Sequence, residues 1–403
     1  MQNESVKHQA SGRVTGGQGP SGDGLTGGKD RPWHLRAWSG IHFLAYCRLL
    51  ARNRFQISPS RIPMACMLMM ISLFNSVLMI FNSIWFGAKI REAHLVDTPI
   101  FVLGHWRSGT TLLHELLCCD PQHTYPTTFT GFAANHFLVT EPLLKRLIRF
   151  ALPDKRPMDN VRIGWDTPQE DEWALCNLGL PSPYFTILFP NRPPQYPEYR
   201  SLKAISTQER KVWQNGLNGF LKALTVRQPK RIVLKNPLHS YRVPALLEMY
   251  PNARFIHIVR DPFEVYASTM HTWRRMFAYQ GLQVPRFEHL SEYVLDNFQV
   301  MYDDLPDDLK AISKGRLCEL RYEDLVQDPV GQLQMIYQTL EIEGFDNAVP
   351  EIRKYASQMS EYRTNRHTMD LGLRDQIIAR WSGFFDRYGY SRQSESVVAT
   401  ASA

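Results

Sequence analysis

Hydrophobic positions follow a repeating pattern along the chain after residue 98. Short runs rich in Val, Ile and Phe are followed by segments in which apolar side chains recur at helical spacing. The runs that predict strands are residues 99–104, 231–235, 254–259 and 318–322, and a helix is predicted at 111–117 directly after the first of them. Strands that alternate with helices are typical of βα units. The pattern therefore predicts an α/β fold of three layers (αβα), in which helices cover both faces of a central parallel sheet.

A different pattern precedes this region, because residues 62–88 carry no charge at all. At about 1.5 Å per residue, a helix of this length is long enough to cross a hydrocarbon core of about 30 Å. Its few polar residues recur at helical spacing and form a narrow stripe: Ser72, Asn75, Ser76, Asn82 and Ser83. Three interpretations stay open, namely a helix that is buried or lies on a membrane surface, a transmembrane span, and a helix that binds a partner. Membrane association through residues 62–86 is one of these expectations.

The two ends of the chain differ in composition from its centre. Residues 1–30 contain eight of the 24 Gly residues and almost no large apolar side chain, so this stretch buries too little surface to offset its ordering entropy. No apolar run follows the first Met, which argues against a signal peptide. We therefore expect a disordered tail at 1–32, a hydrophobic helical segment at 33–97, the main domain at 98–392 and a second tail at 393–403.

Composition and charge exclude several classes of protein. Hydrophobic residues make up 44% of the chain and charged residues 21%, as in globular proteins. The 46 Lys and Arg exceed the 39 Asp and Glu by seven, a surplus too weak and too dispersed to predict a nucleic-acid partner. Only Cys118 and Cys119 of the six Cys lie close together, which argues against a disulfide-stapled scaffold. No CxxC, HExxH or Cys/His cluster has the spacing of metal ligands, so we expect no metal site.

The stretch GHWRSGTT at 104–111 joins the first predicted strand to its helix. Gly104 and Gly109 have the spacing of the phosphate loop of nucleotide-binding proteins, where glycine permits a tight turn and amides at the helix N-terminus converge on an anion. Thr110 stands where a kinase or ATPase needs Lys, and the loop's only Arg or Lys is Arg107. The motif therefore predicts a phosphate site, in a form that points away from ATP.

A second motif, VRDPFEVYAST at 259–269, also follows a predicted strand and opens a helix. Arg260 is expected at the carboxyl end of the sheet, where open α/β folds bind ligands, and Ser268 about two turns along the helix. An Arg and a hydroxyl suit a second phosphate, although Asp261 also fits a simple helix cap with Arg260 in a surface ion pair. Taken with the first loop, the motif fits a nucleotide that carries phosphates at two ends.

The two motifs resemble those of sulfotransferases that use 3′-phosphoadenosine 5′-phosphosulfate (PAPS). GHWRSGTT resembles the loop for the 5′-phosphosulfate and VRDPFEVYAS the motif for the 3′-phosphate, while RYEDLVQDP at 321–329 resembles a stretch that follows them in this family. The resemblance covers about residues 99–390. It implies a phosphate-loop αβα fold and metal-independent transfer of a sulfuryl group from PAPS to a hydroxyl or amine, with release of adenosine 3′,5′-bisphosphate.

The resemblance also implies roles for single residues. Those that match the loop around the 5′ end are Arg107, Ser108, Gly109, Thr110 and Thr111. Arg260 and Ser268 match the pair that holds the 3′-phosphate. Lys235, in LKNP, matches the family's strand-end Lys, which contacts the region between phosphate and sulfate. Hydrogen-bond donors and one or two cations suffice to stabilise the transition state of sulfuryl transfer.

The base that takes the acceptor's proton is not defined by the resemblance. Cytosolic members place a His two residues after the strand-end Lys, where this chain has Pro237. The candidates are Glu170 and Glu172 of the acidic cluster, together with His136 and His239. Thr167 and Glu170 also fit a helix capping box, which would give Glu170 a structural role. Helical geometry rotates Glu172 well away from Glu170, so the two cannot both face one cleft.

The acceptor is not indicated by any motif. The apolar segment and the aromatic residues of the Pro-rich stretch 125–230 favour a lipid or another amphipathic alcohol, and a carbohydrate fits almost as well. Two other hypotheses stay open: a phosphoryl-transfer enzyme with a degenerate phosphate loop, and a membrane protein that binds a nucleotide without catalysis. The sequence is compatible with a cytoplasmic and with a membrane-associated location. The late NRH at 365–367 is a further candidate to cover the nucleotide.

Overall fold

The computed structural model describes residues 35–148, 164–359 and 369–392. The strands are β1 (Ile100–Leu103), β2 (His123–Thr124), β3 (Arg231–Lys235), β4 (Arg254–Val259) and β5 (Leu317–Arg321). They form one sheet in the order β2-β3-β1-β4-β5, and each neighbouring pair is parallel. The predicted parallel sheet is thus confirmed, and four of the strands coincide with the predicted runs. The two-residue strand β2 is too short to produce a hydrophobic pattern and is absent from the prediction.

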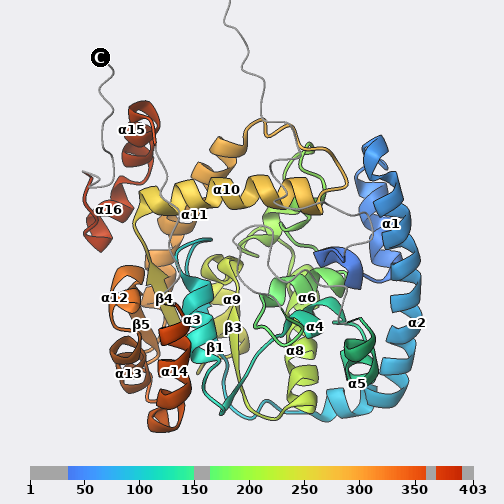
Figure 1. Ribbon diagram of the computed structural model, residues 1–403, viewed down its shortest axis with the longest axis horizontal. Helices are drawn as coiled ribbons and strands as arrows, with labels where there is room; N and C mark the ends of the chain where they lie inside the picture. Colours follow the sequence, from blue (N-terminus) through green and yellow to red (C-terminus); the bar gives the residue numbers. More distant parts are fainter. Residues whose placement is uncertain (1–34, 149–163, 360–368, 393–403) are drawn as a thin grey trace, which may run out of the picture.

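The helices surround this sheet on all sides (Figure 1). In chain order they are α1 (Phe43–Arg52), α2 (Ile62–Glu92), α3 (Thr110–Leu117), α4 (Thr128–Phe132), α5 (Phe137–Leu147), α6 (Asp171–Asn177), α7 (Phe185–Leu188), α8 (Thr207–Arg227), α9 (Val243–Met249), α10 (Pro262–Gln280), α11 (Leu290–Lys310), α12 (Tyr322–Gln327), α13 (Pro329–Thr339), α14 (Phe345–Met359), α15 (Leu371–Arg380) and α16 (Ser382–Tyr388). Short 3₁₀ helices include η2 (Ala37–Gly40) before α1 and η6 (Pro237–Tyr241) after β3.

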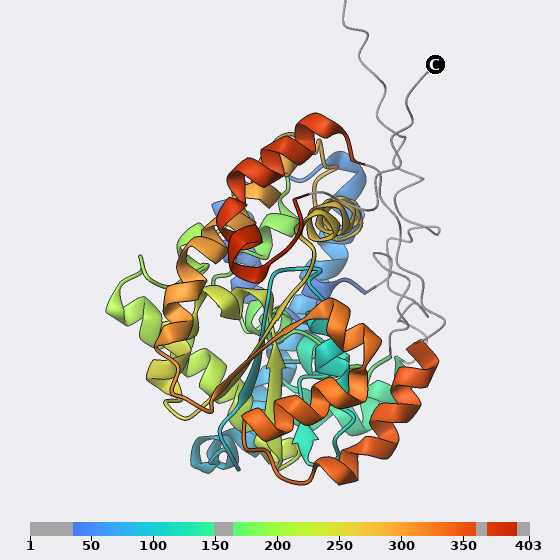
Figure 2. The same ribbon diagram turned by 90° about the vertical axis from the view of Figure 1, so that its left-hand side faces the viewer.

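Side chains that alternate along the strands build two separate hydrophobic cores, because successive residues point to opposite faces of a sheet. Phe101 and Leu103 of β1 belong to a core shared with α8, α9 and α11. Ile100 and Val102 belong to a second core, shared with α3, α13 and α14. Figure 2 shows helices on both sides of the strands. The arrangement is the predicted three-layer αβα fold.

The order of the strands determines where loops suited to a ligand meet. From β1 the chain passes to β2 and β3 on one side of β1, and then to β4 and β5 on its other side. In open α/β folds, ligands bind beyond the carboxyl ends of the strands at such a reversal. Both anion motifs begin here, since residues 104–109 follow β1 and Arg260 follows β4.

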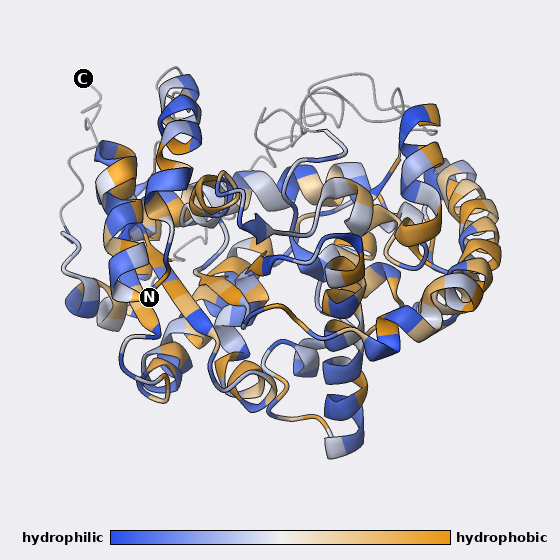
Figure 3. Cartoon of the chain, turned by 90° about the horizontal axis from the view of Figure 1, so that it is seen from below, coloured by the Kyte–Doolittle hydropathy of each residue, from blue (hydrophilic) through white to orange (hydrophobic). Residues whose placement is uncertain are grey.

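Helix α2 lies beside α1 at the edge of the molecule, on the right in Figure 1. Its polar stripe is directed inward: Asn75 donates to the carbonyls of Ser39 and Ile41 at 2.8 and 3.1 Å, and the Ser76 hydroxyl accepts from the amide of Phe43 at 2.9 Å. By length and composition, Pro59–Glu92 is apolar enough to cross a membrane, with 28% of its most apolar window buried. Large hydrophobic side chains are exposed along this helix, Met70, Ile84 and Trp85 among them, and its ribbon at the right edge of Figure 3 is coloured mainly as hydrophobic.

Candidate active site

The loop between β1 and α3 requires glycine at two positions. Gly104 has a φ of +148° and Gly109 a φ of +100°, which side-chain-bearing residues rarely adopt. A Cβ at Gly104 would come within 2.6 Å of the Ser108 hydroxyl, and one at Gly109 would overlap the ring of Tyr322. Gly109 is the N-cap residue of α3, and no side chain caps the first amides of this helix. The loop thus has the geometry of an anion site at a helix N-terminus.

The second motif lies directly against this loop. Arg107 donates from Nε to the hydroxyl of Ser268 at 2.9 Å, and Arg260 donates from Nη1 to the backbone carbonyl of Arg107 at 3.2 Å. The guanidinium of Arg260 also stacks over the ring of Tyr322, 4.4 Å from its centroid. Asp261 accepts from two amides in the first turn of α10 and is a helix cap, as one interpretation of the motif predicts. This cap and the contact of Arg260 with the loop are both present. Two motifs that are far apart in sequence therefore form one cationic region.

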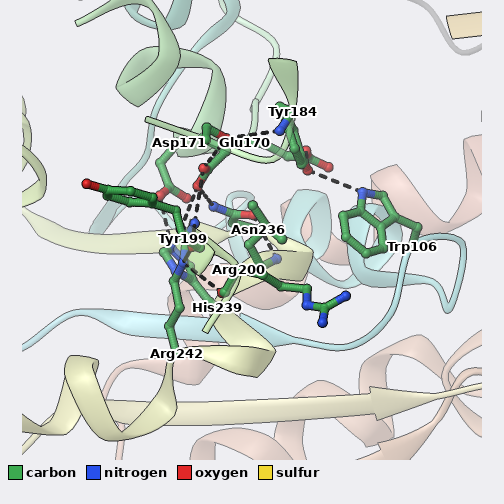
Figure 4. A network of polar contacts seen from close by, with 12 residues as sticks. Trp106, Glu170, Asp171, Tyr184, Tyr199, Arg200, Asn236, His239 and Arg242 are labelled. Atoms are coloured by element: carbon green, nitrogen blue, oxygen red, sulfur yellow. Dashed lines mark hydrogen bonds and ion pairs between the residues drawn. The ribbon is translucent and has the colours of Figure 1, made fainter. Parts of the chain in front are cut away.

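Lys235 and Glu170 form the next part of the site. Lys235, buried at the end of β3, donates from Nζ to Glu170 Oε1 at 2.6 Å, and the side chain of Glu170 keeps 15% exposure. The other oxygen, Oε2, accepts from the hydroxyl of Tyr184 at 2.6 Å, and that hydroxyl accepts from Trp106 Nε1 at 3.3 Å. Figure 4 shows Trp106, Tyr184 and Glu170 in this sequence. The phosphate loop, which contains Trp106, is in this way connected to a carboxylate beside the strand-end Lys.

The capping-box interpretation of Glu170 is wrong. Glu170 is the N-cap residue of α6, but its side chain makes no capping hydrogen bond. The hydroxyl of Thr167 accepts instead from the amide of Gly164 at 2.8 Å. The Glu170 carboxylate is therefore directed toward Lys235 and not toward its own helix.

The side chain of Glu172 points away from that of Glu170 and lies in a different environment. It is fully buried and accepts from Arg242 Nη1 at 2.7 Å, from Asn236 at 2.7 Å and from the Ser182 hydroxyl at 2.6 Å. Arg242 is equally buried and also donates to the carbonyl of Tyr199 at 2.8 Å. The prediction that Glu170 and Glu172 face different directions is confirmed. With both carboxylate oxygens engaged inside the protein, Glu172 has the contacts of a structural residue.

The two histidine candidates lie in packed surroundings. His239 is fully buried on η6, with Nε2 at 3.0 Å from Asp171 Oδ2, another fully buried group. His136 Nε2 contacts Asn75 of α2 at 3.2 Å and its Nδ1 contacts the hydroxyl of Thr140 at 3.0 Å. Burial lowers the pKa of His136 to about 4. The structure thus places His136 between α5 and α2, in contact with neither Glu170 nor Lys235.

The contacts of the aromatic pair Trp106 and Tyr184 were not predicted from the sequence. Tyr184 lies in the Pro-rich PSPYF, which has no recognisable motif, and only the fold brings it to Glu170. Trp106 offered a signal, since it is a hydrogen-bond donor inside the phosphate loop itself. The candidate NRH at 365–367 lies outside the described residues. Within the described parts of the chain, no group of three His, Cys, Asp or Glu side chains is arranged to hold a metal ion.

These features define a class of protein: a phosphate-loop α/β protein with two joined anion motifs, no Walker Lys, and a Lys–carboxylate pair at the end of the neighbouring strand. A family model described as "Sulfotransferase family" matches residues 99–347. The chain belongs to this family and is a sulfotransferase. The hypotheses of a phosphoryl-transfer enzyme and of a non-catalytic nucleotide-binding protein are thereby set aside.

Curated relatives and solved structures agree with this assignment. Omega-hydroxy-beta-dihydromenaquinone-9 sulfotransferase Stf3 of Mycobacterium bovis is 42% identical over 364 residues, which are 90% of this chain and 94% of that protein, and the Mycobacterium tuberculosis protein of the same name matches equally. The crystal structure of sulfotransferase STF9 from Mycobacterium avium has a TM-score of 0.61 at 18% identity, covering 86% of this chain and 96% of that one. Sulfotransferase STF1 from Mycobacterium tuberculosis has a TM-score of 0.59 at 18% identity, with 84% and 91% covered.

Proposed function

We propose that this sulfotransferase moves a sulfuryl group from PAPS to a hydroxyl on the side chain of an isoprenoid quinone lipid. The observation that carries the proposal is the continuous set of contacts that joins Arg260, Arg107, Trp106, Tyr184, Glu170 and Lys235. It combines two anion motifs with a Lys and a carboxylate beside them. Family membership supports the sulfuryl group as the cargo.

The donor residues follow from the motifs. Arg260 and Ser268 bind the 3′-phosphate, and the 5′ end is bound by Arg107, Ser108, Gly109, Thr110 and Thr111. Because Arg107 contacts both Ser268 and, through its carbonyl, Arg260, occupation of one anion site orders the other. Lys235 supplies a cation for the oxygen that bridges phosphate and sulfate, where negative charge develops during transfer.

Glu170 is the proposed general base. The acceptor oxygen forms a bond to sulfur while the bond from sulfur to the 5′-phosphate oxygen breaks, and the acceptor's proton passes to Glu170. Among the four candidates for the base, Glu170 alone contacts Lys235, whereas Glu172 and His239 are fully buried and engaged elsewhere. In-line transfer needs a base for the acceptor hydroxyl and a cation for the leaving oxygen, and Glu170 and Lys235 supply these two groups within one site.

The acceptor is inferred from the curated relative. The name of Stf3 specifies an omega-hydroxylated dihydromenaquinone, a long isoprenoid lipid with a terminal alcohol. The aligned region covers 90% of this chain, including the segment before the catalytic domain, so the acceptor class is proposed to be shared. Such a lipid resides in a bilayer, which makes a membrane-bound enzyme advantageous.

Helix α2 is the proposed membrane contact, in agreement with the expectation for residues 62–86. Six apolar side chains at helical spacing are between 43% and 68% exposed: Leu73, Phe74, Val77, Ile80, Phe81 and Ile84. The opposite side is held by Asn75 and Ser76 inside the protein, which favours a helix lying in the membrane plane over a span. Exposed basic residues, Arg48 on the neighbouring α1 and Lys89 near the end of α2, suit anionic lipid headgroups.

Calorimetric titration with adenosine 3′,5′-bisphosphate, ATP and 5′-AMP, without magnesium, tests the donor. Binding that depends on the 3′-phosphate supports PAPS as the donor. Equal affinity for nucleotides with and without the 3′-phosphate rejects it. For the acceptor, full-length protein is incubated with PAPS and an omega-hydroxylated dihydromenaquinone in detergent, and the sulfated lipid is measured by mass spectrometry. The matched substrate lacking the terminal hydroxyl should give no product.

Flotation with vesicles of phosphatidylglycerol or of phosphatidylcholine tests the membrane contact. We expect the wild-type protein to float with the anionic vesicles, and Phe74→Asp/Ile80→Asp to remain at the bottom while it still binds the bisphosphate. Resistance of the bound protein to alkaline carbonate would indicate a span instead. A dimer in light scattering that disappears in the double variant would assign the apolar face to a second copy.

A further inference from the structure

We infer that Tyr184 is a positioning residue that orients the Glu170 carboxylate and connects it to the phosphate loop through Trp106. The inference rests on the proposed function, in which Glu170 is the base. Tyr184 is the residue directly before α7 and is 2% exposed. Its hydroxyl donates to Glu170 Oε2 at 2.6 Å and accepts from Trp106 Nε1 at 3.3 Å (Figure 4).

The ring of Tyr184 is held firmly enough to position another group. Trp173 of α6 packs edge-on against it, with ring centroids 4.9 Å apart. The backbone amide of Tyr184 donates to the Ser182 hydroxyl at 3.1 Å, and this hydroxyl donates in turn to the buried carboxylate of Glu172 at 2.6 Å. Both ends of Tyr184 are therefore anchored to α6, the helix that begins directly after Glu170.

The hydrogen bond from Tyr184 to Glu170 becomes more important at the step where Lys235 contacts the nucleotide donor. In the structure, Lys235 engages Oε1 of Glu170 and Tyr184 engages Oε2. When Lys235 turns to the bridging oxygen of the nucleotide, Tyr184 remains as the contact that fixes the carboxylate. Burial and the neighbouring carboxylates raise the pKa of Tyr184 well above its usual value, so its hydroxyl keeps its proton throughout the neutral range.

Trp106 extends this arrangement into the donor site. It lies between Gly104 and Gly109 of the loop, and its ring packs on Trp273 of α10, with centroids 5.8 Å apart. Since the indole N–H donates to Tyr184, the hydroxyl of Tyr184 has its accepting lone pair occupied and is directed as a donor toward Glu170. The loop that receives the donor and the base that receives the proton thereby share one chain of hydrogen bonds.

Several charged groups around Glu170 bear on its protonation. Lys235 approaches from β3 and Tyr184 from the start of α7. On its own segment, Asp171 is paired with His239 and Glu172 with Arg242. Removal of the Tyr184 hydroxyl leaves these pairs in place and breaks its hydrogen bonds with Glu170 and Trp106. Only the first of these touches the carboxylate, so a change in the pH profile reports on its loss.

The test compares Tyr184→Phe with Tyr241→Phe in full-length protein, by steady-state kinetics with PAPS and the omega-hydroxylated dihydromenaquinone over a range of pH. Tyr241 is a matched control, because it is equally buried and donates to a carbonyl of Asn297 at 2.6 Å. We expect Tyr184→Phe to lower kcat about 10- to 100-fold, as for a hydrogen bond to a charged group, with the KM for PAPS within about twofold. The acidic limb of its kcat profile should move to higher pH, and Tyr241→Phe should do neither.

A double variant separates this inference from the proposed function. If Tyr184 acts through Glu170, Tyr184→Phe should cause no further loss of kcat in a Glu170→Gln background. Wild-type kcat and pH profile in Tyr184→Phe, with an inactive Glu170→Gln, would overturn the inference alone. Full activity of Glu170→Gln would overturn the base assignment itself. Should Tyr184→Phe fold poorly, Trp106→Phe removes the indole donor while keeping an aromatic ring, and it is expected to shift the same limb in the same direction.

Discussion

Replacement of Glu172 by Ala is expected to destabilise the protein strongly. Glu172 and Arg242 form an ion pair in which both side chains are fully buried, at 2.7 Å. Removing one member of such a pair leaves the other charge without its partner, which costs about 3–5 kcal/mol. Asn236 and the Ser182 hydroxyl also lose their acceptor. Two carbonyls still accept from Arg242, so the lower half of that range is the more realistic value.

Urea denaturation followed by circular dichroism measures this loss of unfolding free energy. Asp304→Ala is the control, since its exposed pair with Lys203 at 2.8 Å should contribute about 0–1 kcal/mol. The double variant Glu172→Ala/Arg242→Met should recover part of the stability, because no unpaired charge is then buried. A loss below about 1 kcal/mol in Glu172→Ala, or no recovery in the double variant, would refute the structural role of Glu172. Inactivity of a stably folded Glu172→Gln would point to Glu172 as the base.

Three further predictions follow from the same geometry. Gly109→Ala should abolish binding of adenosine 3′,5′-bisphosphate in calorimetry, because its φ of +100° and the ring of Tyr322 leave no room for a Cβ, and retained affinity would contradict the loop assignment. Arg107→Ala and Arg260→Ala should each weaken that binding by about 1.5–3 kcal/mol, with non-additive effects because the two residues touch; unchanged affinity in both would reject the two-anion site. Burial lowers the pKa of His136 from 6.5 to about 4, so the unfolded state binds more protons than the folded state between these pH values. The unfolding free energy should therefore fall by up to about 1.4 kcal/mol per pH unit on acidification. Urea titrations of His136→Gln should show a weaker pH dependence than those of the wild type, and an equal dependence would contradict this linkage.

Local sequence was sufficient to predict the two anion motifs. Each motif is a strand, a turn and a helix that follow one another directly in the chain. The spacing of Gly104 and Gly109 therefore predicts the amides of the first motif, and the position of Arg260 predicts the cation of the second. The parallel sheet was predictable for the same reason, since each strand carries its own hydrophobic run. The order of the strands in the sheet was not predictable, because it depends on which face of the sheet each connecting helix crosses.

The proposed base, Glu170, could not be selected from the sequence, because its neighbours come from separate segments. Glu170 and Glu172 are two residues apart and chemically alike, yet one meets Lys235 and the other Arg242. The turn before α6 decides this, as Thr167 bonds to Gly164 and leaves Glu170 outside the helix. Such a turn depends on packing among distant loops and leaves no periodic pattern.

The sequence by itself therefore determined a phosphate-loop α/β protein with two anion motifs and one long apolar helix. Each of these properties is carried by residues that are neighbours in the chain. Tertiary structure alone decided that Tyr184 and Trp106 join Glu170 to the loop, and that the polar stripe of α2 faces inward, where Asn75 binds backbone carbonyls. Both outcomes require contacts between segments far apart in sequence, whose energies of packing and hydrogen bonding exist only once the chain has folded.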